Sequence, residues 1–242
     1  YGDATGGIIN VTTKGPSRVF GFGLEAETSQ FLDAFGYNRL GFNLNGPIFT
    51  KKDENGNVLS SLFGYFIAGD ITYRQDGRPV SSDIYKANDD YLAQIEETPL
   101  IPTGLESGTF QSAAYTTMED LTKIKSTENT STWNVNLSGK LDVKTGKNTN
   151  LSFGGSYYMR DGNNWNYFHS LFNYAKNVHS VGNTWRVFGR FTQRFPTSPE
   201  SNSLVKNVYY SIQVDYTRDQ GYSEDPTHKD DLFKYGYLGR YD

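Results

Sequence analysis

The sequence predicts an all-β fold, an antiparallel transmembrane β-barrel segment, and three observations support it. Stretches of about ten residues alternate strictly between apolar and polar side chains, as strands with one apolar face do. Aromatic residues make up 15% of the 242 residues and glycine contributes 25, yet mean hydropathy is −0.62. That balance is typical of a barrel with an apolar skin, aromatic girdles and a polar interior. No apolar stretch approaches the ~20 residues of a membrane helix, so any crossing must use strands.

The clearest element is a hairpin with strands over residues 133–143 and 151–160. The first strand places these residues on one face: Trp133, Val135, Leu137, Gly139, Leu141 and Val143. Its other face carries Asn134, Asn136, Ser138, Lys140 and Asp142. The second strand repeats the pattern after a short turn that contains Gly146. Each run is about the length that a tilted strand needs to cross the hydrocarbon.

Alternation predicts six further strands, which makes about eight in all. They cover residues 20–26, 40–44, 63–73, 185–194, 208–216 and 233–237. Glycines inside these runs are expected to serve barrel curvature, since no strand-to-helix phosphate loop follows them.

The predicted connections alternate between long and short from the third strand onward. A span of about 75–131 is followed by a tight turn near 144–149, a loop near 161–183, a shorter turn near 196–206 and a longer loop near 218–231. Outer-membrane barrels have short periplasmic turns and long extracellular loops. The pattern therefore predicts that 1–18 and 144–149 are periplasmic and 75–131 extracellular, although the link at 31–36 is short for an external loop. Within 75–131 we expect one short helix over 88–96 and another over 121–125, opened by a capping box at 117–120.

The opening residues are the most specific stretch of the chain. They read Tyr-Gly-Asp-Ala-Thr-Gly-Gly-Ile-Ile-Asn-Val-Thr-Thr-Lys-Gly-Pro, a glycine pair feeding a short strand and a Gly-Pro break. This stretch resembles the end of the plug domain in TonB-dependent outer-membrane receptors of the Bacteroidota type. The resemblance is carried by Gly2, Ala4, Gly6, Gly7, Ile9, Thr13, Lys14 and Gly15. It implies a plug end over 1–16 and the N-terminal part of the barrel over 17–242.

The resemblance also implies function and partners. The family is an energy-coupled importer with about 22 strands around a plug, which implies outer-membrane lipid and a TonB-type inner-membrane complex as partners. A surface lipoprotein partner and an oligosaccharide, peptide or chelate substrate are compatible with it. The sequence departs from the family in lacking the coupling box, most of the plug and the last strands. We therefore expect it to be a fragment of a longer bacterial outer-membrane protein.

Catalytic, metal and nucleic-acid sites are not expected. The chain has no cysteine and three histidines that lack ligand spacing, and its net charge of −4 offers no footprint for nucleic acid. Paired acids such as Asp89 and Asp90 fall in loops rather than in a water-controlled cleft. Residues 52–57 resemble a calcium loop only in composition, so loop calcium is a minor alternative to no cofactor.

Two groups of side chains are candidates for ligand or partner contacts. Arg186, Arg190 and Arg194 share the polar face of one strand, where they would face the lumen and meet plug acids or an anionic solute. Trp165, Tyr167 and His169 lie in an aromatic, amide-rich loop suited to stacking on sugars or contacting a partner.

Nutrient import across the outer membrane is the leading functional hypothesis. The alternative is a structural barrel that scaffolds a larger outer-membrane complex. A small eight-stranded passive or adhesive barrel fits the strand count but not the plug-like start, and an enzyme is disfavoured.

Overall fold

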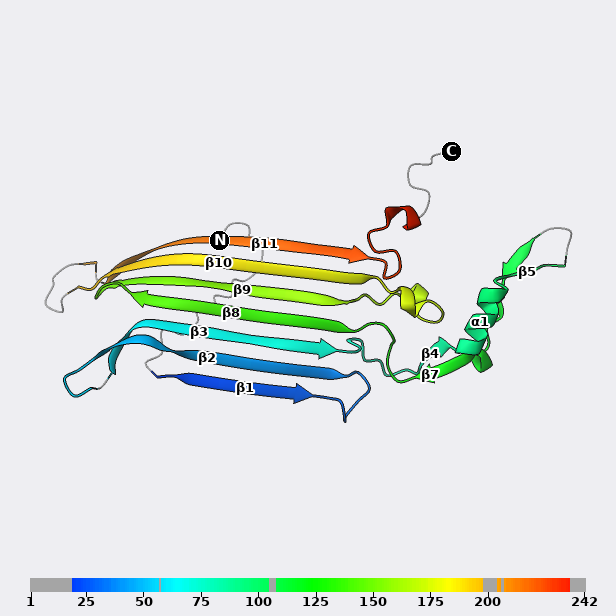
Figure 1. Ribbon diagram of the computed structural model, residues 1–242, viewed down its shortest axis with the longest axis horizontal. Coiled ribbons are helices and arrows are strands. Elements are labelled where there is room, and N and C mark those ends of the chain that lie inside the picture. Colours follow the sequence, from blue (N-terminus) through cyan, green and yellow to red (C-terminus); the bar gives the residue numbers. More distant parts are fainter. Residues whose placement is uncertain (1–18, 57, 105–107, 198–203, 206, 236–242) are drawn as a thin grey trace.

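One antiparallel sheet of seven strands dominates the protein (Figure 1). The computed structural model describes residues 19–56, 58–104, 108–197, 204–205 and 207–235, so the predicted plug end at 1–16 lies outside the described residues. The strand order is β1-β2-β3-β8-β9-β10-β11. The strands are β1 Gly21–Thr28, β2 Tyr37–Lys52, β3 Val58–Arg74, β8 Thr132–Lys144, β9 Thr149–Asn163, β10 His179–Phe195 and β11 Val208–Glu224. The predicted all-β antiparallel class is confirmed, and closure into a barrel stays a prediction.

The sheet has one apolar and one polar face because residues paired across strands point to the same side. Ile67 on β3 is paired with Leu44 on β2 and with Gly139 on β8. One residue further along β3, the pairing runs from Asn43 through Ala68 to Ser138. The alternation read from the sequence thus extends across the sheet, with the register keeping both faces continuous.

In the described part of the chain the sheet is a single layer without a packed core on either face. Among the described residues, Ala87 is the one buried apolar side chain. Apolar side chains on the apolar face are open instead, such as Leu24 at 65% and Ile212 at 60% exposure. Seven strands ~4.8 Å apart with apolar runs of about eight residues give a face of roughly 900 Å². Water-soluble monomers rarely expose more than about 600 Å² in one apolar patch, so this face needs an apolar cover.

Aromatic pairs mark both ends of the apolar face. The pairs at the end that carries the longest connection are Tyr73–Trp133 and Trp185–Tyr216, with ring centroids 4.8 and 5.3 Å apart. The pairs at the other end are Phe49–Phe63 and Phe195–Tyr210, at 6.2 and 6.0 Å. We call the apolar surface between them the apolar band. The interval from Phe63 to Tyr73 is about 33 Å along the strand, or about 25 Å tall at a tilt of ~40°.

The connections differ between the two ends of the sheet (Figure 1). One end carries 53–57, 145–148 and 196–207, and we call it the turn end. The other end, the loop end, carries 29–36, 75–131, 164–178 and the segment after β11. The loop expected at 161–183 is shorter than predicted, and β11 runs on to Glu224. Polar residues such as Asn163 and Ser180 continue strand pairing beyond the apolar band, which hydrophobic alternation alone does not reveal.

Residues 75–131 form an extension that projects from the loop end (Figure 1). It contains β4 Ile84–Ala87, α1 Asp89–Glu97, β5 Leu100–Pro102, β6 Thr109–Gln111, η1 Ser112–Tyr115, η2 Met118–Asp120 and β7 Leu121–Ile124. β4 pairs with β7, and β5 pairs with β6. No helix in the described part of the chain is long and apolar enough to cross a membrane.

One helix of the extension was predicted correctly and the other was not. The predicted helix at 88–96 is α1, with the Asn88 side chain accepting the Tyr91 N–H at 2.8 Å. The predicted capping box is present at Thr117 and Asp120, but it opens a single 3-10 turn. The helix expected over 121–125 is wrong, because Leu121–Ile124 pairs with β4 as strand β7. Tertiary pairing outweighs the local helix signal there.

The eighth strand expected at 233–237 is also wrong over the described residues. Leu232–Tyr235 is the 3-10 helix η5, entered through Lys229 with a positive φ of 48°. The N–H of Lys234 bonds to the carbonyl of Asp231, and their side chains form an ion pair at 3.4 Å. These local bonds turn the chain away from the edge of β11.

Candidate functional site

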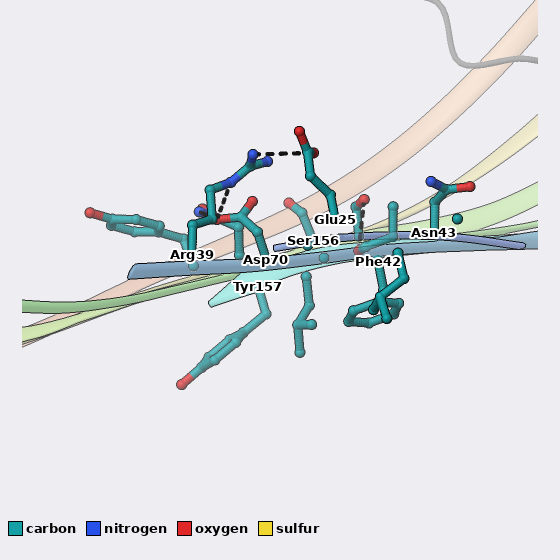
Figure 2. A pocket seen from close by; sticks show the side chains of 16 residues that line it. Glu25, Arg39, Phe42, Asn43, Asp70, Ser156 and Tyr157 are labelled. Carbon is teal, nitrogen blue, oxygen red and sulfur yellow. Dashed lines mark hydrogen bonds and ion pairs between the residues drawn. The ribbon is translucent and has the colours of Figure 1, made fainter. Parts of the chain in front are cut away.

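The polar face of the sheet carries the charged groups that offer chemistry. Figure 2 shows Arg39 and Glu25 on one side of the sheet and Phe42 and Tyr157 on the other. Arg39 Nη1 lies 3.3 Å from Glu25 and 3.2 Å from Glu27, and its Nε lies 4.0 Å from Asp70. Three carboxylates around one guanidinium leave this part of the face, over β1–β3, net negative. It lines a cavity of about 610 Å³.

The three arginines predicted to face the lumen do not form a single cluster. Arg186 forms an ion pair with Asp215 at 3.2 Å, and the Nε of Arg190 donates to Gln213 at 2.8 Å. Arg194 lies further toward the turn end, where it lines a cavity with Arg190 but not with Arg186. All three lie on the polar side of β10 by register, since Arg186 is paired with Ser156 and Arg190 with Ser152.

The turn-end cavity is the more basic region of the polar face. Its volume is about 960 Å³, and its charged lining residues are Lys140, Asp142, Lys144, Lys147, Arg190 and Arg194. Asp142 is buried and forms an ion pair with Lys140 at 3.0 Å, and it accepts a hydrogen bond from Ser152. With Lys140 paired to Asp142, four further cations make this surface complementary to an acidic surface or solute.

A second basic cavity lies at the loop end, and we call it the arginine pocket. It has a volume of about 420 Å³, and its lining includes Arg74, Asp76, Arg78, Arg160 and Trp165. Of the three aromatic-loop candidates, Trp165 lines this pocket. Tyr167 packs edge-on against Trp165 with centroids 6.2 Å apart and is 71% exposed. His169 lies outside the pocket lining, in the 3-10 helix η3 (Tyr167–His169).

The three pocket arginines are the site residues that sequence reasoning missed. Arg74 and Arg160 are 86 positions apart in the chain, and strand register alone brings them to one end of the sheet. Arg78 follows Asp76 in a turn whose Asp-Gly sequence is a turn signal. The alternation of β9 placed Arg160 on the polar face, but it gave no indication of which arginines are near it.

The loops at the loop end are held together by buried polar contacts. Asn129, at a positive φ of 52°, donates from its side chain to the carbonyl of Tyr174 at 2.9 Å and accepts from Asn163 at 2.6 Å. Asn177 is 1% exposed and donates to the carbonyl of Asn129 at 3.1 Å. Tyr174 belongs to η4, Tyr174–Lys176. The connection 75–131 is therefore docked on the loop 164–178.

A histidine joins three strands at the rim of the loop end. His179 lies beyond Trp185 and so outside the apolar band. Its Nε2 lies 2.8 Å from Asp161 on β9 and its Nδ1 lies 3.4 Å from Glu224 on β11. Hydrogen bonding to Asp161, and secondarily to Glu224, raises the pKa of His179 above its ordinary value against the opposing effect of burial. The protonated ring therefore clamps β9, β10 and β11 together.

No group of three or more candidate metal ligands occurs among the described residues. Residues 53–56 form a turn in which Asp53 accepts the Asn55 N–H at 3.0 Å. Loop calcium at residues 52–57 stays a prediction.

Comparison with known proteins adds one distant likeness. No family model matches the sequence, and no curated protein matches it. One similar solved structure is a mutant of the ferric enterobactin receptor of Pseudomonas aeruginosa, which is 13% identical with a TM-score of 0.31. The match covers 89% of this chain and 30% of that chain, so this chain spans less than a third of its length.

Proposed function

We propose that this chain forms part of the wall of an outer-membrane TonB-dependent receptor that imports a nutrient. The observation that supports it most is the single-layer sheet, whose roughly 900 Å² apolar face has no protein cover among the described residues. Lipid is the cover that fits, because the apolar band is about 25 Å tall and bordered by aromatic side chains at both ends. The polar face then lines a lumen.

The orientation follows from the two ends of the sheet. The extension 75–131 and the loop 164–178 lie at the loop end, which we assign to the cell exterior, and the turns 53–57 and 145–148 to the periplasm. The motif over 1–16 supports a plug inside the lumen. The basic turn-end cavity is suited to bind acidic groups of such a plug. This proposal entails an inner-membrane coupling complex as a partner. It also permits a surface lipoprotein that binds at the loop end.

Cysteine labelling tests the membrane placement, because the chain has no cysteine of its own. Glu96→Cys places a thiol in the exposed extension and Lys147→Cys places one in an exposed turn. A membrane-impermeant maleimide should label Glu96→Cys on intact cells and Lys147→Cys only after the outer membrane is permeabilised. The reverse result contradicts the orientation, and labelling of both on intact cells contradicts the crossing.

Import itself is tested in the producing bacterium. Deleting the gene should abolish growth on its nutrient, and dissipating the inner-membrane proton gradient should abolish uptake by the wild type. If every nutrient is taken up normally in the deletion strain while an outer-membrane complex falls apart, the protein is a scaffold and not an importer.

A further inference from the structure

The arginine pocket is lined by three arginines that come from separate parts of the chain. Arg74 ends β3, Arg78 follows in the next turn, and Arg160 lies on the polar face of β9. The strand partners of Arg160 are Asn134 and Gly182, neither of which is acidic. All three side chains are exposed, so solvent screens part of their mutual repulsion, and a bound anion would relieve the rest.

The one carboxylate in the pocket lining is already used for another purpose. Asp76 is 1% exposed, and its two oxygens accept the backbone N–H groups of Arg78 at 2.8 Å and Thr127 at 2.7 Å. It fixes the turn that carries Arg78. Among the described residues, none of the three guanidinium groups forms an ion pair, whereas Arg39 has three acidic neighbours and Arg186 has Asp215.

Aromatic rings hold two of the guanidinium groups in place. Arg78 lies over the ring of Trp165 at 4.1 Å, and Arg74 lies over the ring of Tyr37 at 5.4 Å. A guanidinium that meets an aromatic face keeps its N–H donors, which lie in its own plane, free for a ligand. The stacking therefore positions the donors before an anion arrives, which lowers the entropy lost on binding.

Neutral polar groups complete the pocket. Thr132, Asn134, Asn163 and Asn164 contribute hydroxyl and amide groups to its lining. A volume of about 420 Å³ lies in the range of small-molecule sites, which span about 300–1,000 Å³. An arginine fork matches a pair of oxygens on a carboxylate, sulfate or phosphate group, and the amides and hydroxyls match a polar body attached to such a group.

We propose that the arginine pocket binds an anionic solute, a polar molecule that carries a carboxylate, sulfate or phosphate group. The assignment of the pocket to the lumen mouth rests on the proposed function, while binding itself does not. The pocket lies on the polar face of the sheet, away from the apolar band, so a soluble ligand and not a lipid headgroup is its occupant.

Calorimetry on the detergent-purified protein tests this directly. The probes are a sulfated uronic-acid disaccharide and the neutral disaccharide cellobiose. The sulfated probe should bind and cellobiose should not, and raising NaCl from about 0.1 M to about 1 M should weaken binding because it screens the charges. Arg78→Gln and Arg160→Gln should each weaken binding about tenfold or more, since each removes charge-assisted hydrogen bonds.

Matched variants separate the pocket from general charge effects. Arg160→Lys keeps the charge but loses the fork, so its loss should be smaller than that of Arg160→Gln. Lys125→Gln removes an exposed cation of the same connection that does not line the pocket, and it should leave binding unchanged. Heat-dependent gel mobility confirms that each variant is folded.

Four outcomes would overturn the proposal. The first is equal binding of both disaccharides, and the second is no binding of the sulfated probe at millimolar concentration. The third is binding that Arg78→Gln and Arg160→Gln leave intact. The fourth is binding of phosphatidic acid micelles in place of the soluble probe. Because calorimetry does not depend on transport, failed uptake with intact binding counts against the proposed function and not against the pocket.

Discussion

Neighbouring residues at the middle of β3 give the sharpest test of which face meets lipid. Ile67 points to the apolar face between Leu44 and Gly139 and is 44% exposed, while Ala68 points to the polar face between Asn43 and Ser138. Ile67→Arg and Ala68→Arg place the same side chain one residue apart on opposite faces. We expect the first to destabilise the folded protein strongly and the second to be tolerated.

The size of the effect follows from the position of Ile67 in the apolar band. It lies about 13 Å along the strand from Phe63 and about 20 Å from Tyr73, or about 10 and 15 Å in height at a tilt of ~40°. An arginine side chain reaches only about 6 Å, so it cannot carry its charge to the headgroups. An arginine near the bilayer midplane on a lipid-facing strand costs about 2–4 kcal/mol. A cost of about 3 kcal/mol corresponds to roughly a hundredfold change in the folding equilibrium.

The assay is urea-dependent folding into phosphatidylcholine vesicles, followed by heat-dependent gel mobility. Ile67→Arg should shift the folding midpoint to lower urea, whereas Ala68→Arg should stay near the wild type, since Asp70 lies two residues along the same face. Equal destabilisation by both variants, or a larger loss for Ala68→Arg, would refute the assignment of the faces.

Three further predictions concern the loop end. Asp76→Ala removes the acceptor of two backbone N–H groups, and an unpaired buried donor costs about 1–3 kcal/mol. Hydrogen exchange in 75–78 and 126–131 should therefore be at least tenfold faster in this variant. Unchanged exchange would contradict this. Asn129→Ala, forced into a positive φ, should expose the loop 164–178 to protease more than Asn129→Gly does, because the left-handed conformation costs a non-glycine residue about 1–2 kcal/mol. The raised pKa of His179 means that its stabilisation is complete below the unfolded pKa of about 6.5 and is lost as pH rises through the folded pKa. Protection from exchange at the loop ends of β10 and β11, measured relative to the intrinsic base-catalysed rate at each pH, should therefore fall at alkaline pH in the wild type. In His179→Gln this protection should not change with pH; a variant in which it still falls would rule out the clamp.

The strands were predictable because a run of alternating residues gives each of them one apolar face. The run from Trp133 to Val143 identified β8, and its partner run identified β9. The strand ends were not predictable in this way, because pairs such as Asn163 with His179 are polar on both sides and depend on hydrogen bonding alone. The two misassigned segments, 121–125 and the described residues 233–235, are short, and their structure is decided by a partner strand and by local ion pairing.

The candidate sites depend on register, which a single sequence gives poorly. Alternation placed Arg186, Arg190 and Arg194 on one polar face, but only the pairing with β11 reveals that Arg186 is matched by Asp215. The arginine pocket joins β3, β9 and the turn at Asp76, so no local pattern contains it. The sequence identified Trp165 as an aromatic loop residue, but only the fold reveals that Arg78 lies over its ring.

The extension between β3 and β8 also bears on the order in which the sheet assembles. β8 and β9 meet after a turn of about 4 residues, whereas β3 and β8 must close about 57, which costs roughly 2.4 kcal/mol more in chain entropy. Once β4 pairs with β7, only about 16 unpaired residues remain in the loop between β3 and β8. This offsets about 1.1 kcal/mol of the entropy cost of closing that loop. We therefore expect β1–β3 and β8–β11 to form first as two separate antiparallel units. Pairing of β3 with β8 should come last, after the paired strands of the extension have brought the two units close together.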